Sequence, residues 1–257
     1  DDFTGPLANR QVYYESSRGC PFRCAYCLSS VQRGVRHKEL SQVETELAGI
    51  MAHEPLIIKF VDRTFNDNPE RALAIWRWLA AQPQSTRCHF EIAPDRFSEE
   101  MFAFLADLAP GRFQFEIGIQ ATSPDTLTAI NRDMDVAAAL ANIRRLVALG
   151  TVHLHVDLIL GLPFDTRETF RRSLNQVFSL GAHHIQMGLL KVLPTTPISR
   201  EADRCGLVFC EQPPYEVLAT RWLAHRELSE LYALGECVES FHNNRYFPTL
   251  WRYLRRS

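Results

Sequence analysis

The sequence lacks a long apolar run, a strong excess of charge and any internal repeat. No stretch approaches the length of a membrane-spanning helix, and the first residues show no signal-peptide pattern. Because 28 Lys and Arg face 30 Asp and Glu, the net charge is only −2, and no overall field draws the chain to nucleic acid or to a membrane. We therefore expect an ordinary globular protein of the cytoplasm.

Cysteine is scarce and unevenly placed. The count of seven is odd, which fits a reduced compartment better than a disulfide framework. Cys88, Cys205, Cys210 and Cys237 share no compact motif, and we interpret them as small hydrophobic residues. The other three cysteines lie together in one short loop.

This loop has the spacing Cys20-x3-Cys24-x2-Cys27. Three thiolates so close together cannot all pair as disulfides, but they can converge on one metal centre. A fourth local ligand, which would close a zinc site or an ordinary [4Fe–4S] cluster, is missing. A cubane held by three cysteines leaves one iron open for a substrate or cofactor. The competing interpretation is a non-catalytic zinc-binding interaction module completed by a distant His or Cys.

Hydrophobic periodicity predicts alternating strands and helices. Strands separated by helices of ten to fifteen residues indicate βαβ units and a parallel sheet, with catalytic groups at the carboxyl ends of the strands. Six units rather than eight predict an α/β fold, a partial (βα)6 TIM-like barrel. The expected strands are 12–17, 56–62, 88–93, 113–120, 152–160 and 184–190, and the helices are 40–53, 69–81, 99–108, 137–149 and 167–180.

The strand at 113–120 alternates in polarity. Gln114, Glu116, Gly118 and Gln120 share one face, and Phe and Ile occupy the other. Since the helices need the apolar face, the polar face is predicted to line a wet interior.

The three-cysteine loop, with Tyr26 just before its last cysteine, resembles the signature of the radical S-adenosylmethionine (SAM) superfamily. The resemblance implies a [4Fe–4S] cluster on Cys20, Cys24 and Cys27, SAM chelated at the open iron, and Tyr26 beside the adenine. It also implies reductive cleavage of SAM to a 5′-deoxyadenosyl radical that abstracts hydrogen from a small-molecule or peptide substrate. A flavodoxin-type or other electron donor is the implied partner.

Further stretches of the sequence show the same resemblance. Asp62 stands where the family binds the methionine ammonium of SAM, although the glycines usual there are absent. The surroundings of Glu91, Gln120 and Arg132 are similar to oxygen-independent coproporphyrinogen oxidases, which implies that Glu91 bonds the SAM ribose and that Arg132 binds the methionine carboxylate. The resemblance also places Asp157 near the ribose.

Four of these residues also have a purely structural interpretation. Asp62 can form a turn, and Asp157 can bond neighbouring backbone amides. Glu91 can pair with a helix, and Arg132 can be a solvated helix end. Glu116, on the polar face, completes the expected cofactor-binding set.

The amino-acid sequence of residues 13–27 resembles that of radical SAM proteins that carry a cobalamin-binding domain before the barrel and a poorly characterised domain after it. We expect a lead-in at 1–10, the radical SAM core at 11–200 and a mainly helical extension at 201–257. Because Asp1 is not an initiator and no Asp-x-His-x-x-Gly motif occurs, we expect cobalamin to sit on a preceding segment of a longer protein. Cobalamin-dependent methyl transfer is then implied, and the alternative is a cobalamin-independent radical oxidoreductase.

Overall fold

The computed structural model describes residue 7 and residues 10–31, 34–83, 85–244, 249–250 and 253. The expected lead-in at 1–10 and the arginine-rich tail at 245–257 therefore lie almost entirely outside the described residues. The chain divides into two compact units. Unit 1 comprises Asp1–Pro21, Gln32–Ile117 and Ala141–Leu154, and unit 2 comprises Phe22–Val31, Gly118–Leu140 and His155–Ser257.

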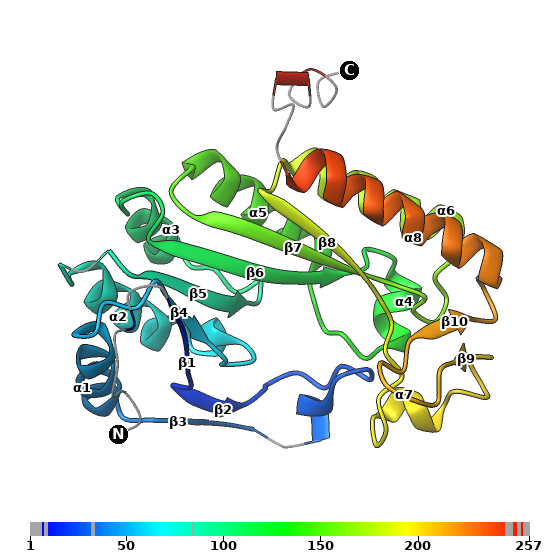
Figure 1. Ribbon diagram of the computed structural model, residues 1–257, viewed down its shortest axis with the longest axis horizontal. Coiled ribbons are helices and arrows are strands. Elements are labelled where there is room, and N and C mark those ends of the chain that lie inside the picture. Colours follow the sequence, from blue (N-terminus) through cyan, green and yellow to red (C-terminus); the bar gives the residue numbers. More distant parts are fainter. Residues whose placement is uncertain are drawn as a thin grey trace. The chain divides into compact units, whose positions relative to one another are not determined.

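The fold is α/β, as predicted, with a six-stranded parallel sheet (Figure 1). Neighbouring strands of this sheet follow one another along the chain, as consecutive βαβ units predict. Within the part of the chain that the structure describes, the strands do not close into a ring, since β1 and β8 form the two edges. The strand order is β1 (Gln11–Tyr14), β4 (Ile57–Phe60), β5 (Arg87–Ile92), β6 (Phe113–Gln120), β7 (His153–Leu160) and β8 (His184–Leu189).

Two helices of unit 1, which follow Asn68 and Ser98, begin at side-chain caps. The Asn68 side chain accepts a hydrogen bond from Arg71 N at 3.0 Å, and Ser98 Oγ accepts one from Met101 N at 3.2 Å. A short 3₁₀ helix, η2 (Phe65–Asp67), follows β4. The helices are α1 (Leu40–Met51), α2 (Pro69–Ala80), α3 (Glu99–Ala106) and most of α5 (Val136–Leu149).

The core of unit 1 is aromatic. Phe60, Phe90 and Phe115 project from one face of adjacent strands and are fully buried, as is Trp76 of α2. The ring centroids of Phe60 and Phe90 lie 4.7 Å apart, and those of Trp76 and Phe115 lie 5.2 Å apart. Burying such rings is the largest apolar contribution that a side chain can make. The opposite face of β6 is half-buried and polar, which confirms the predicted alternation.

One hairpin of unit 1 was not predicted. β2 (Ser17–Gly19) pairs antiparallel with β3 (Val35–His37), with Ser17 opposite His37. Both strands are three residues long and rich in polar side chains, so periodicity gives no signal for them.

Unit 2 contains the end of β6, most of β7, and β8. Its longest helix, α6 (Arg167–Leu180), has the predicted bounds, starts at a capping box on Thr166 and ends at Gly181 in the left-handed conformation (φ 80°). The other elements are η1 (Leu28–Val31), α4 (Pro124–Ala129), α7 (Pro197–Arg200), β9 (Val208–Phe209), β10 (Val217–Ala219), α8 (His225–Cys237) and the π-helix η3 (Val238–Asn243).

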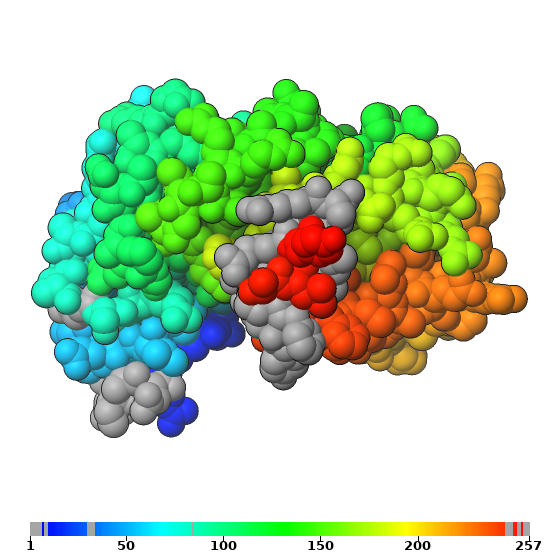
Figure 2. Space-filling view, turned by 90° about the horizontal axis from the view of Figure 1, so that it is seen from above, coloured from blue at the N-terminus to red at the C-terminus, as the bar shows by residue number. Residues whose placement is uncertain are grey.

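Apolar residues at helical spacing over 217–234 predict a helix in the C-terminal extension, but in the structure this helix begins only at His225. The first residues of this range instead form β10, which pairs antiparallel with β9. The Thr220 side chain then accepts hydrogen bonds from Trp222 N and Leu223 N, and so turns the chain before the helix. Figure 2 shows α8 beside α6 on the surface of this unit. Among the described residues, no helix is both long and apolar enough to cross a membrane.

Candidate functional site

In unit 2 the cysteine loop is held by backbone hydrogen bonds on both sides. Ala25 N donates to Ile130 O at 2.7 Å, and Ile198 N, in α7, donates to Ala25 O at 2.9 Å. The Asn131 side chain adds a bond from Nδ2 to Arg23 O at 2.9 Å. Segments far apart in the sequence thus fix the part of the loop that carries Cys24 and Cys27.

Arg132 bonds directly to a cysteine of this loop. Its Nη1 donates to Cys24 Sγ at 3.4 Å, and its Nη2 donates to the carbonyl of Gly118. A guanidinium beside a sulfur stabilises the negative charge that the sulfur carries as a metal-ligating thiolate. The residues present therefore fit a thiolate-bound cluster.

The loop also contains a tyrosine and three cysteines that form no disulfide. Burial raises the pKa of Tyr26 well above its usual value, so the phenol stays neutral. Cys20, Cys24 and Cys27 are all free of disulfides. In the described part of the chain, no three His, Cys, Asp or Glu side chains gather closely enough to hold a metal ion. The assignment of the three cysteines as ligands thus rests on their motif and on the chemistry around Cys24.

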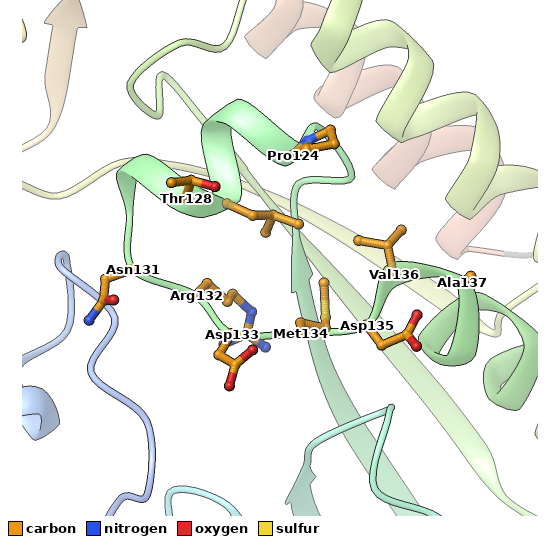
Figure 3. Close-up of a pocket in the computed structure, with 10 residues that line it drawn as sticks. Pro124, Thr128, Asn131, Arg132, Asp133, Met134, Asp135, Val136 and Ala137 are labelled. Carbon is orange, nitrogen blue, oxygen red and sulfur yellow. The ribbon is translucent and has the colours of Figure 1, made fainter.

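A pocket of about 610 Å³ opens beside Arg132 (Figure 3). It is lined by α4 and by the segment that leads from α4 into α5. Arg132, Asp133 and Asp135 supply its charged groups. A mixed-charge pocket bordering the cysteine loop suits a polar, zwitterionic ligand better than an apolar one.

Gln120 ends β6 in a strained conformation. Its φ of 68° is rare outside glycine, and the strain costs about 1–3 kcal/mol. Among the described residues, its buried Oε1 has no hydrogen-bond partner. A strained residue with a buried orphan oxygen at the carboxyl end of a strand is typical of a ligand contact.

In unit 1 the polar face of the sheet carries a charge cluster. Glu91 of β5 lies opposite Glu116 of β6 in the sheet register. His89 Nε2 and Lys59 Nζ lie 3.0 and 3.4 Å from Glu116 Oε2. Arg63 Nη1 lies 3.9 Å from Glu91 Oε1. Glu91 therefore faces the polar side, and its ion-pair partner Arg63 lies in the turn after β4 rather than on a helix.

The two glutamates have opposite pKa shifts. The hydrogen bond with His89 is the main cause that lowers the pKa of Glu116 to about 2. Burial, followed by repulsion from Glu116, raises the pKa of Glu91 to about 7. Two carboxyls whose environments separate their pKa values are a recurrent feature of functional sites.

Asp62 has structural partners in unit 1. Its buried carboxylate accepts hydrogen bonds from Ser16 N at 3.0 Å, Ser16 Oγ at 2.6 Å and Ser17 Oγ at 2.6 Å. These bonds tie the end of β4 to the chain that enters the cysteine loop. Its expected role at the methionine ammonium of SAM stays a prediction.

Two carboxyls lie on and just after β7: Asp157, which the sequence predicts, and Asp165, which it does not. Asp157 is half-buried opposite Gln186, on the polar side of β7. Beyond the Gly161-Leu162-Pro163 turn, Asp165 is completely buried, accepts from Thr169 Oγ1 at 2.5 Å, and has a pKa raised by burial to about 6. Its position just before the N-cap Thr166 is the only signal in the sequence.

The four other cysteines differ from one another. Cys88 and Cys205 are buried, as small hydrophobic residues are expected to be, and burial raises the pKa of the Cys88 thiol to about 12. Cys210 is half-buried, and Cys237 is exposed.

The family model described as "Radical SAM superfamily" matches residues 14–177. The chain belongs to the radical SAM superfamily. Its cofactors are those of the family, a [4Fe–4S] cluster and SAM, and the chain is an enzyme of this class. A second model, a protein of unknown function (DUF4080), matches residues 203–257.

Two curated relatives are methyltransferases of streptomycete-type bacteria. The 2-(S-pantetheinyl)-carbapenam-3-carboxylate methyltransferase of Streptantibioticus cattleyicolor is 27% identical over 95% of this chain and 39% of its own length. The cobalamin-dependent radical SAM methyltransferase TokK of Streptomyces tokunonensis is 26% identical with the same coverage. The chain thus spans about two fifths of the length of these relatives.

Solved structures share the fold. TsrM from Kitasatospora setae, with cobalamin and a [4Fe–4S] cluster bound, superposes with a TM-score of 0.67 at 21% identity, over 80% of this chain and 43% of that one. Coproporphyrinogen III oxidase (HemN) from Escherichia coli superposes with a TM-score of 0.58 at 16% identity, over 89% and 52%. The sequence resembles both cobalamin-linked radical SAM proteins and oxygen-independent coproporphyrinogen oxidases, and these two solved structures, one of each kind, share the fold of this chain.

Proposed function

We propose that this chain is the catalytic core of an enzyme that cleaves SAM reductively to a 5′-deoxyadenosyl radical. The observation that carries the proposal is the Arg132–Cys24 contact within a three-cysteine loop of radical SAM spacing. When bound, the cluster supplies the single electron for the cleavage. That electron comes from a flavodoxin-type protein or another external donor.

The chain's own residues have the following proposed roles. Cys20, Cys24 and Cys27 hold the cluster. Arg132 binds the methionine carboxylate of SAM. Its planar guanidinium can donate two parallel hydrogen bonds to a carboxylate once the side chain turns away from the Gly118 carbonyl. The remaining groups proposed to contact SAM or to line its site are Tyr26, Glu91, Glu116, Gln120 and Asp157, with Asp62 supporting the loop.

We further propose that the full protein transfers methyl groups with cobalamin, which is bound by residues outside this chain. Both of the relatives described above are methyltransferases, and TokK is cobalamin-dependent, which supports this choice. Cobalamin would supply the methyl-transfer chemistry in the full protein. The 5′-deoxyadenosyl radical would activate the substrate carbon by abstracting its hydrogen atom, and would be released as 5′-deoxyadenosine.

The experiment uses the full-length natural protein, purified anaerobically with hydroxocobalamin present. The visible spectrum should show a bound corrinoid. SAM deuterated at its methyl group, with reductant and cell extract, should then yield deuterium-labelled methylated products in mass spectrometry. A protein without corrinoid that still forms 5′-deoxyadenosine would overturn the cobalamin branch and favour the radical oxidoreductase.

A further inference from the structure

The segment just after β4 contacts the first cysteine of the loop. Thr64 Oγ1 lies 3.5 Å from Cys20 Sγ, and both residues belong to unit 1. Thr64 is only 6% exposed, and Cys20 is half-buried. Nothing in the motif of the loop points to this threonine, which lies 44 positions away.

The geometry of this contact is fixed from both sides. Asp62, two residues before Thr64, accepts three hydrogen bonds from Ser16 and Ser17, which lead into β2 and Cys20. At Gly19, which has φ 107°, a side chain would collide with the carbonyl of Gly34 across the β2–β3 hairpin. The entry to the loop is therefore held at both strands of the hairpin and at the end of β4.

The chemistry decides which atom donates. In the structure the Thr64 hydroxyl also bonds the carbonyl of Arg63 at 2.7 Å, and either atom of the Thr64–Cys20 contact could be the donor. A cysteine that ligates iron carries no proton, so its sulfur can only accept. Rotation about one bond then turns the Thr64 proton from the Arg63 carbonyl to Sγ.

We propose that Thr64 is a positioning residue that donates a hydrogen bond to the ligating sulfur of Cys20 and thereby raises the reduction potential of the cluster. The inference rests on the proposed function, since it requires a cluster on Cys20. Hydrogen bonds to ligand sulfurs stabilise the more negative, reduced state of an iron–sulfur cluster. The cluster gains one electron from the external donor, and the proton stays on Thr64 throughout.

The test is a redox titration of the anaerobically reconstituted protein, followed by electron paramagnetic resonance. Thr64→Val removes the donor at nearly constant volume, and Thr64→Ser keeps it. Thr64→Ala is a second donor-free variant if valine does not fit the loop. The matched control is Thr86→Val, because buried Thr86 likewise bonds a backbone carbonyl, that of Pro55 at 2.8 Å, but does not belong to the loop.

We expect Thr64→Val to lower the ratio of reduced to oxidised cluster about tenfold at a fixed potential, which corresponds to a midpoint about 59 mV more negative. Thr64→Ser and Thr86→Val should keep the wild-type midpoint. Donor-free variants that titrate like wild type would overturn the inference and leave the proposed function standing. A wild-type protein that takes up no [4Fe–4S] cluster would instead overturn the proposed function, and this inference with it.

Discussion

Asp62 provides the sharpest test of how the cysteine loop is supported. The resemblance to the family makes it a ligand of SAM, whereas its three hydrogen bonds to Ser16 and Ser17 make it an anchor of the loop. The two roles predict different consequences of Asp62→Asn. An anchor contributes to folding in the absence of any cofactor, and a ligand contributes only to binding.

The expected magnitude follows from the contacts. An asparagine offers one acceptor oxygen, which can keep the bond from the Ser16 N–H, so its NH2 group must face the hydroxyls of Ser16 and Ser17. Both hydroxyl protons then lose their charged acceptor inside the protein, which costs about 3 kcal/mol. Ser16 and Ser17 are 1% and 5% exposed, so water cannot take the place of the carboxylate.

The assay is urea unfolding of the cluster-free protein under reducing conditions at neutral pH. Asp107→Asn is the control because Asp107 is an exposed C-cap of α3, and its unfolding free energy should stay within about 0.5 kcal/mol of wild type. In addition, the effects of Asp62→Ala and Ser17→Ala should be non-additive, since the two side chains share a bond. An Asp62→Asn variant with wild-type stability and weakened SAM binding would refute the anchor role.

Three further predictions follow from other contacts. Arg132→Ala should weaken SAM binding, measured by calorimetry, roughly ten- to a hundredfold, because a charge-assisted bond of about 1.5–3 kcal/mol is lost. The control Arg144→Ala, at an exposed arginine, should leave the affinity unchanged. An Arg132→Ala variant with wild-type affinity would contradict the proposed carboxylate contact. The pKa of Glu91 is about 7 in the folded chain against an ordinary 4.5, so its stabilisation is complete below about pH 4.5 and is lost as the pH rises through 7. Glu91→Gln should therefore gain on the order of 2 kcal/mol relative to wild type between pH 5 and 8 in denaturant titrations, and a constant difference would argue against the shift. Gly161→Ala should destabilise the chain by about 1–3 kcal/mol in thermal melts, because φ is 83° and the new Cβ would lie 2.6 Å from Val217 Cγ1; an unchanged melting temperature would show that this turn can relax.

Local signals explain why most of the fold could be predicted. The helix–strand alternation has strong periodicity, and caps such as Asn68, Ser98 and Gly181 stand next to the elements that they bound. The β2–β3 hairpin and the strand β10 were missed because they are three residues long and depend on pairing with distant segments. Tertiary pairing overrides such weak local preferences.

In the candidate site too, the features that could be predicted are local in the sequence, and those that could not be predicted depend on distant contacts. Three cysteines within eight residues reveal themselves by spacing alone, and the polar face of β6 by its period. The partners of Asp62 lie 45 and 46 residues away in the sequence, and Thr64 contacts Cys20 from 44 residues away. A pattern along the chain cannot assign such contacts, since they depend on which strand end lies beside the loop.

The central claim is that the three-cysteine loop binds a cluster that cleaves SAM. Its most direct test is the amount of 5′-deoxyadenosine formed from SAM and dithionite by the anaerobically reconstituted protein, compared with the Cys24→Ala variant. We predict that wild type forms 5′-deoxyadenosine together with methionine and that the variant forms none. A colourless wild-type protein that binds stoichiometric zinc and leaves SAM intact would contradict the claim.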